Sequence, residues 1–503
     1  MSRRWDLLVA LALFGAALVV RLFFATLLPF PPLDDPAFYV QTARNLAGGR
    51  GLIIDVIWSY QVPFMQVTHL SHEYWMPLST FLIAPFVALF GDTLFAAQAP
   101  GAISGALLIP ITYGLARLVW PEDRRPAIAA AAPLIPAALP IYQSASADSA
   151  APFAVCASLA LIAGGLSIER RSAGWAFLAG ALGGLAYLAR SDGLLVLLCI
   201  AAYIVFRFGF RRATIAPLLG LFAGTAVTIG PWWLRNLAAF GQTQPVSPMV
   251  GIALQSYGQL FNWNEPPTLS SLLERGVGFV IDLRLKAVLH NLRVLLTISF
   301  PYGLYGLPGL FLVKRPMIRL GLIYLVALLL TSALIFSVPT LSGLFYHSAA
   351  ATLPWLAVGG VGLLRSVGAL RVGRPIAVGL YLATLALIAI QSAVALPAAI
   401  ADGAINQAKF ARAAEWLRDN APAGQPVIAT QAHTLNYASD YPALTLPNRQ
   451  GVDVLRRLAE RYGARFVVVT ERVGLYPDAL DAAEAIGVRK RLDAEGVVIY
   501  ELP

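Results

Sequence analysis

The sequence predicts a polytopic α-helical membrane protein with about eleven transmembrane helices and a small α/β domain at its C-terminus. The 503 residues are 58% hydrophobic and only 13% charged, whereas a soluble domain carries about 25% charged residues. Apolar runs recur through most of the chain, and a bilayer core of about 30 Å needs roughly 20 helical residues. Beyond residue 400 the pattern changes to short alternating strands and helices.

The predicted spans follow from the length and hydrophobicity of each run. The first run follows Arg3 and Arg4, but it is longer than a signal-peptide core and no small-residue cleavage site follows it, so we expect a retained anchor. The stretch 77–90 is apolar but short, and we expect an interfacial helix there. The expected spans are 6–28, 94–119, 127–143, 150–168, 173–189, 191–207, 214–233, 291–313, 318–338, 347–365 and 375–396.

Basic residues set the expected orientation, because Lys and Arg gather in cytoplasmic loops. With a cytoplasmic N-terminus, every basic loop falls on the cytoplasmic side, and counting 77–90 as a full span would invert all later loops. We therefore expect a multi-pass protein of the plasma (inner) membrane, with the net charge of +10 reflecting topology and not a nucleic-acid partner. The basic loops hold Arg117, Arg124, Arg125, Arg170, Arg171, Arg207, Arg211, Arg212, Lys314, Arg315, Arg319, Arg365, Arg371 and Arg374.

Three segments are then expected outside the membrane: the first outer loop 29–93, the long outer loop 234–290, and a soluble domain of residues 400–503 that follows the membrane domain 1–397. The last segment has strand patterns at 426–430, 465–470 and 496–502, with helices expected near 451–463 and 478–486. We expect this α/β domain to fold alone and to bind or orient an acceptor. Both cysteines lie inside apolar runs, so no disulfide framework is indicated.

Acidic residues at the expected outer face are few. Asp34 and Asp35 follow the first span and precede Pro36, which suits a helix N-terminus. Adjacent carboxylates also suit general-base or metal chemistry. Asp148 lies between two spans, where an ionisable group is a functional candidate, although it could equally cap the span that starts at Ala150.

Cations at the same face are candidates for binding a phosphate. Arg235, which follows two tryptophans, can hold a lipid phosphate through paired hydrogen bonds. Arg190 has Asp192 two residues away, and we favour a local ion pair there. His347 begins an outer-side span and could bind a phosphate, shuttle a proton or fill a polar niche.

A short cluster has the spacing of metal ligands. His69, His72 and Glu73 can share one face of a helix, which makes them candidate ligands for a divalent metal such as Zn, Mg or Mn. Such clusters also arise by chance, so no cofactor is assigned. The sequence has no Walker-type phosphate loop, which leaves ATP-driven transport without support.

The order of these features resembles a known family, the GT-C membrane glycosyltransferases, in the branch of protein O-mannosyltransferases and lipid A aminoarabinose transferases. The similarity covers about residues 5–400. Its most specific pieces are Leu33-Asp-Asp-Pro-Ala-Phe-Tyr, Ala43-Arg-Asn-Leu-Ala-Gly-Gly, Tyr74-Trp-Met-Pro-Leu and Ser146-Ala-Asp.

The resemblance implies a glycosyltransferase that moves a hexosyl or pentosyl group from a polyprenyl- or dolichyl-phosphate donor to a lipid, glycan or protein acceptor in the cell envelope. It implies that Asp34 activates the acceptor in an inverting transfer, with Asp35 and Asp148 at the other acidic positions. The sequence differs from the family's usual pattern at two places that concern binding of the donor phosphate. His347 stands where relatives often have Arg, and Trp75-Met76-Pro77 replaces a Lys before Pro-Pro.

A lipid-linked sugar flippase or secondary transporter is the alternative function. Transporters usually place charges mid-span facing a cavity, whereas here the ionisable groups gather at one face. A receptor that displays the 400–503 domain would need only one span and would leave the outer acidic residues without a role.

Overall fold

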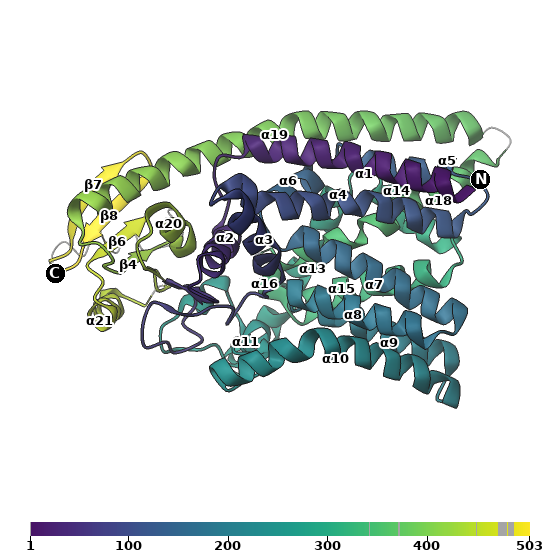
Figure 1. Cartoon of the computed structure of the whole chain (residues 1–503). Helices are drawn as coiled ribbons and strands as arrows, with labels where there is room; N and C mark the ends of the chain where they lie inside the picture. The colour runs from purple at the N-terminus through teal and green to yellow at the C-terminus, as the bar shows by residue number, and fades with distance from the viewer. Residues whose placement is uncertain (1, 342, 371–372, 449, 471–479, 481–486) are drawn as a thin grey trace.

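The structure is a computed structural model that describes residues 2–341, 343–370, 373–448, 450–470, 480 and 487–503. A bundle of helices makes up most of the molecule, and a β-sheet of mainly C-terminal strands lies beyond one end of it (Figure 1). We call this end of the bundle the sheet end. The N-terminus lies at the opposite end, which we call the far end.

Seven described helices or helix runs are apolar and long enough to cross a membrane, and two bent pairs raise the number to nine. Three shorter apolar helices accompany them: α3 (Leu78–Phe90) at the expected interfacial stretch, and α8 (Ala173–Ala189) and α9 (Gly193–Phe208) at two of the expected spans. The seven are α1 (Ser2–Leu27), α4 (Leu94–Val119), α7 (Ala150–Arg170), α10 (Arg212–Phe240), α15 (Pro316–Leu334), the run α17–η3–α18 (Leu344–Gly368) and α19 (Gly373–Asn420).

Two of the expected spans, 127–143 and 291–313, are bent pairs of helices and not single straight helices. The first consists of α5 (Arg125–Ala131), η1 (Ala132–Leu134) and α6 (Ala138–Ala145), with a bend of 61°. The second consists of α13 (Val277–Ser299) and α14 (Gly303–Leu312), with a bend of 93°. Prolines lie at both breaks, and a proline lacks the N–H that would continue a helix.

Arg21, a charged residue inside the first span, stabilises the first break. It lies in α1 and is fully buried. Its guanidinium donates to the carbonyls of Ala17 at 3.2 Å and Leu134 at 3.3 Å. Backbone groups that a broken helix exposes at membrane depth must be satisfied by protein, and Arg21 does this for the end of η1.

The segments between the spans are also ordered into short elements. Residues 29–93 hold α2 (Asp34–Ala47), α3 and a two-stranded pair of β1 (Ile53–Ile54) with β3 (His69–Leu70). The long loop after α10 holds α11 (Pro248–Ala253), η2 (Tyr257–Phe261) and α12 (Leu269–Glu274), and α16 (Ser337–Leu341) follows α15.

The sheet has six strands in the order β2-β5-β4-β6-β8-β7, and the first three pairings are parallel. Helices α20 (Ala432–Ser439) and α21 (Val452–Tyr462) connect its strands. The predicted strands and first predicted helix coincide with β4, β6, β8 and α21. Most of the helix expected at 478–486 lies outside the described residues, as does Arg371. The strands are β2 (Val56–Ile57), β4 (Val427–Ala429), β5 (Ala443–Thr445), β6 (Phe466–Val469), β7 (Arg489–Ala494) and β8 (Val497–Glu501).

The sheet does not respect the domain boundary expected near residue 400. Strand β2 comes from residues 29–93, and it pairs in parallel with β5, with Val56 opposite Ala443. Helix α19 runs unbroken through the expected boundary and lies along the length of the molecule (Figure 1). The C-terminal residues therefore share their sheet and their longest helix with the rest of the chain.

Candidate active site

Asp34 does not cap its own helix, as one interpretation of the sequence held. The N-cap position of α2 is Leu33, and no side chain caps it. Asp34 Oδ1 instead accepts hydrogen bonds from the backbone N–H of Thr434 at 3.0 Å and from its hydroxyl at 2.7 Å. Thr434 lies in the first turn of α20, so Asp34 satisfies a free N–H at the start of a helix 400 residues away in sequence.

Asp35 belongs to a different environment, a cluster of charged groups at the sheet end of the bundle. Burial and the nearby Asp148 carboxylate raise the pKa of Asp35, while His347, Arg190 and a hydrogen bond with Trp75 act in the opposite direction. The side chain is half-buried. The two adjacent carboxylates that the sequence treated together therefore have separate surroundings.

Asp148 forms the centre of the cluster through an ion pair with His347. Its Oδ2 lies 2.9 Å from His347 Nδ1, and its Oδ1 accepts hydrogen bonds from the N–H and the hydroxyl of Ser149. Burial alone would raise the pKa of Asp148, but His347, Ser149 and Arg190 outweigh it and lower the pKa to about 2. The N-cap of α7 is Ser149, so the capping interpretation of Asp148 was wrong.

Arg190 makes the expected local ion pair and also reaches the cluster. Its Nε lies 3.2 Å from Asp192 Oδ1, and its Nη1 donates to Ser149 Oγ at 3.2 Å. Asp192 in turn accepts a hydrogen bond from Ser348, the neighbour of His347. The turn between α8 and α9 is thereby tied to both the start of α7 and the segment that holds His347.

Arg235 makes its contacts in the described residues outside this cluster. It donates to the carbonyl of Ser71 and to Asn236, both at 3.0 Å, and its guanidinium lies over the ring of Trp232 at 4.8 Å. In the part of the chain that the structure describes, no contact joins Arg235 to Asp35, Asp148 or His347.

The three expected metal ligands do not come together, and no group of three His, Cys, Asp or Glu suited to a metal forms among the described residues. His69 Nε2 lies 3.6 Å from Glu73 Oε1. His72 is turned away with a φ of 70° and shares hydrogen bonds with Ser71 at 2.8 Å and Thr80 at 3.1 Å. Burial and the charge of Arg235 lower the pKa of His72 to about 3, so it serves as a neutral hydrogen-bonding group.

Several residues of the site were missed by the sequence analysis. Tyr39 lies one helical turn after Asp35, which was a usable signal, and its phenol hydrogen-bonds with Ser149. Trp75 was named only as part of the family motif, and the structure places it beside Asp35. His433, buried in α20, packs edge-on against Trp75 with ring centroids 5.1 Å apart. Neither His433 nor Thr434 could be linked to the site from sequence.

The arrangement combines carboxylates with a histidine and an arginine where several helices end. A carboxylate can take a proton from a hydroxyl group, and a histidine with an arginine can stabilise a charged phosphate. The aromatic side chains of Tyr39 and Trp75 line the same place. Such a combination is suited to group transfer from a phosphate-linked donor.

Comparisons with known proteins agree with this chemistry. Residues 75–233 match the family model described as dolichyl-phosphate-mannose-protein mannosyltransferase. No curated protein sequence matches the chain. A similar solved structure is ArnT from Cupriavidus metallidurans bound to undecaprenyl phosphate, with a TM-score of 0.60 and 15% identity over 100% of this chain and 98% of that one.

Two further solved structures share the architecture. The apo state of the same ArnT has a TM-score of 0.57 and 16% identity, covering 98% of this chain and 97% of that one. The apo oligosaccharyltransferase of Archaeoglobus fulgidus has a TM-score of 0.56 and 15% identity, covering 93% and 70%. The family match over residues 75–233 and the fold shared over nearly the whole chain confirm the resemblance to the GT-C membrane glycosyltransferases, among them ArnT and the protein mannosyltransferases.

Proposed function

We propose that the protein transfers a sugar from a polyprenyl-phosphate-linked donor to an acceptor at the outer membrane face, with inversion at the anomeric carbon. The observation that carries the proposal is the Asp148–His347 ion pair, at 2.9 Å, beside Asp35 and Arg190. A dolichyl phosphate in the description of the matching family and an undecaprenyl phosphate in a similar structure support the donor class.

In an inverting transfer the acceptor oxygen forms a bond to the anomeric carbon as the bond from that carbon to the phosphate oxygen breaks. The lipid phosphate leaves already charged and needs no proton, whereas the acceptor hydroxyl must lose one. Asp34 accepts this proton from the acceptor hydroxyl in our proposal, as the resemblance implies. The hydrogen bonds from Thr434 would fix the direction of its carboxylate.

The donor phosphate needs cations that are already positioned. His347 and Arg190 suit this role, because the ion pairs with Asp148 and Asp192 hold each of them at the site before the donor arrives. The contacts of Arg235 favour a structural role beside Ser71 instead.

A divalent metal at Asp148 would have to displace groups that already bind both carboxylate oxygens, namely His347 at one and Ser149 at the other. The two carboxylate oxygens of Asp148 therefore suit the observed ion pair and hydrogen bonds better than they suit a metal ion. We therefore route no step through a metal, and we expect chelation to leave transfer intact.

The acceptor is a lipid, a glycan or a protein, and we propose that α20 helps to orient it. This helix stands next to the acidic residues, with His433 against Trp75 and Thr434 on Asp34. A flippase or transporter is not favoured, because the ion pairs gather where helices end and not along a path through the bundle.

The test is transfer of radiolabelled sugar from synthetic polyprenyl-phosphate donors by the purified protein in lipid nanodiscs. His347→Gln keeps a polar side chain but removes the imidazole that pairs with Asp148, so turnover should fall in protein that thermal unfolding shows to be folded. His290→Gln, which changes a histidine outside the site, is the matched control. Normal transfer by His347→Gln would contradict the assigned role of the Asp148 pair.

The proposed orientation is tested by thiol labelling in intact cells. Met65 is 80% exposed in the first outer loop, and Phe210 is 99% exposed at the far end of the bundle. In a background of Cys156→Ser and Cys199→Ser, an impermeant thiol reagent should label Met65→Cys and spare Phe210→Cys. The reverse pattern would place the site in the cytoplasm.

A further inference from the structure

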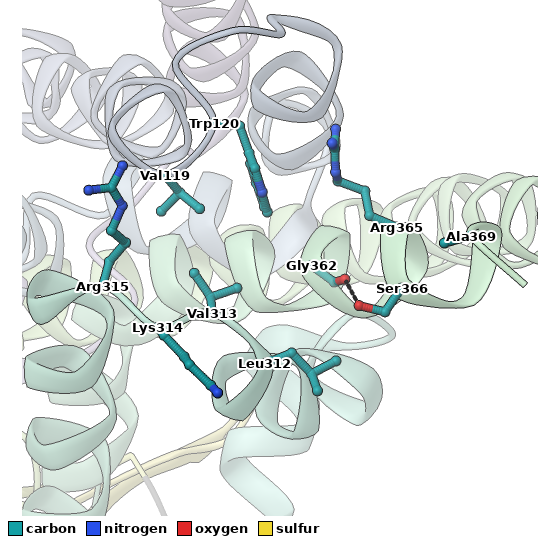
Figure 2. A pocket seen from close by; sticks show the side chains of 10 residues that line it. All are labelled: Val119, Trp120, Leu312, Val313, Lys314, Arg315, Gly362, Arg365, Ser366 and Ala369. Atoms are coloured by element: carbon teal, nitrogen blue, oxygen red, sulfur yellow. Dashed lines mark hydrogen bonds between the residues drawn. The ribbon is translucent and has the colours of Figure 1, made fainter.

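A pocket of about 440 Å³ lies at the far end of the bundle, away from the candidate active site. Figure 2 shows its walls: Val119 and Trp120 at the end of α4, Leu312 to Arg315 at the end of α14 and just beyond it, and residues of the end of α18 between Gly362 and Ala369. Its volume is in the range of small-molecule sites, which is about 300–1,000 Å³.

Close packing of α14 against α18 brings these helix ends together. Gly309 faces Gly359, and a Cβ atom at Gly309 would overlap the backbone carbonyl of Gly359. A Cβ atom at Gly359 would likewise meet the carbonyl of Gly306. Because glycines carry no side chain at this crossing, the two helices lie close together, and Lys314, Arg315 and Arg365 at their ends line one pocket.

Three cations line the pocket, and their acidic partners do not neutralise them fully. Arg315 pairs with Glu169 at 2.8 Å, and Arg365 lies 3.6 Å from Asp123. The second distance exceeds the usual 2.7–3.2 Å of an N–H···O bond, so Arg365 has donors to offer to a ligand. Lys314 is exposed, and no ion pair for it occurs among the described residues.

Apolar side chains continue from the pocket onto the surface. Phe311 is 66% exposed, Leu312 is 49% exposed and Leu370 is 65% exposed. At the end of membrane-spanning helices, exposed apolar groups face lipid chains while neighbouring cations reach the headgroup level. Trp120 carries the Arg365 guanidinium over its ring at 5.5 Å, an amphipathic pairing that suits this depth.

We propose that this pocket binds the phosphate headgroup of an anionic phospholipid of the adjacent leaflet, with its acyl chains along Phe311 and Leu312. Basic pockets between spans bind such headgroups, and a guanidinium gives a phosphate oxygen paired hydrogen bonds. The site is independent of sugar transfer, since it lies at the opposite end of the bundle from Asp148. A soluble phosphate would not need the apolar rim.

The experiment measures phosphatidylglycerol retained by the protein from nanodiscs of phosphatidylcholine with phosphatidylglycerol, by native mass spectrometry. Lys314→Ala with Arg365→Ala should weaken retention by at least about tenfold, because it removes direct charge-assisted hydrogen bonds to the phosphate. Arg207→Ala with Arg211→Ala is the matched control, because it removes two exposed cations from the same end of the bundle outside the pocket. Retention by the control should stay within about threefold of the wild type.

A second variant keeps every charge and fills the space. Ser366→Trp places an indole in the pocket from an exposed position, so it should fold normally and still lose the bound lipid. Equal loss in the pocket and control variants would mean that the face attracts anionic lipid only through its total charge. Retention by Ser366→Trp, or displacement of the lipid by millimolar inorganic phosphate, would also overturn the proposal.

Discussion

Replacing Asp34 by Asn separates its two roles, the hydrogen bonds to α20 and the proposed removal of the acceptor proton. Asn keeps an oxygen that can accept from the N–H and the hydroxyl of Thr434, which lie 3.0 and 2.7 Å from Asp34 Oδ1. A hydrogen bond to a charged group contributes about 1.5–3 kcal/mol and a neutral one about 0.5–1.5 kcal/mol. The change should therefore weaken the attachment of α20 by about 2–3 kcal/mol over the two bonds.

Other contacts hold α20 in place, so this loss should not release it. Gln41 donates to the Asn436 side chain at 3.0 Å, the Arg44 guanidinium lies 4.5 Å from the centre of the Tyr437 ring, and β2 pairs with β5. The loss of a general base, in contrast, typically lowers the rate by 10²–10⁴. We expect Asp34→Asn to fold, bind donor and transfer sugar at least about a hundredfold more slowly.

The assay is single-turnover transfer from a radiolabelled donor, with thermal unfolding measured on the same preparation. Thr434→Val is the matched variant, because it removes the hydroxyl bond to Asp34 and leaves the carboxylate intact. It should lose less than about tenfold in rate, since a weaker attachment alone does not remove the base. Wild-type turnover in Asp34→Asn, or equal losses in both variants, would refute the assignment of Asp34 as the base.

Four further outcomes follow from the site. Arg190→Ala should raise the donor KM about tenfold or more, as the loss of a charge-assisted bond to phosphate implies. Arg235→Ala should mainly lower the unfolding temperature. Equal donor KM in wild type and Arg190→Ala would mean that His347 binds the phosphate without Arg190. Burial and Asp148 raise the pKa of Asp35, so the stability linked to its proton is complete below its ordinary value of 3.8 and is lost as pH rises through the folded value. Asp35→Asn should accordingly raise the unfolding midpoint at pH 8, and the gain should shrink on acidification; a constant gain from pH 8 to pH 4 would argue against this cause. Excess EDTA should leave transfer unchanged, and loss restored by Mn²⁺ would show a metal. Residues 400–503 expressed alone lack β2, so their sheet should be less stable than that of the same segment supplied with a peptide of residues 50–60. Equal protection from hydrogen exchange in the two samples would show that β2 is dispensable.

The spans were predictable because each depends on local composition. A run such as 150–168 is apolar enough to identify α7 within two residues, and the run 94–119 has the bounds of α4, whereas α10 continues to Phe240, beyond the predicted 214–233. The breaks in 127–143 and 291–313 were not recognised, although prolines marked both. Their cost is offset by groups from distant segments, such as Arg21 at the end of η1, and hydropathy does not register such contacts.

The sequence identified several residues of the site, but it did not show which of them contact one another. Asp148 and His347 were both identified as candidates, yet 199 positions separate them and nothing in either segment shows that they meet at 2.9 Å. Arg235 was expected at the phosphate because it follows two tryptophans, but its guanidinium lies over the rings of Trp232 and Phe240 and donates to the carbonyl of Ser71. Contacts between Asp34 and Thr434 depend on how β2 joins the C-terminal sheet, which is a property of tertiary packing.

Helix α19 connects the membrane-spanning bundle with the sheet beside the candidate site. Its 48 residues correspond to about 72 Å at 1.5 Å per residue, more than twice the thickness of the hydrocarbon core. Pro397 interrupts its hydrogen bonds near the middle and provides a hinge. A tilt of about 10° there would move Asn420, roughly 35 Å further along, by about 6 Å. A change in bilayer thickness that tilts the part of α19 before Pro397 relative to the part after it would thus displace the sheet and α20. The displacement would be comparable to the size of a sugar ring.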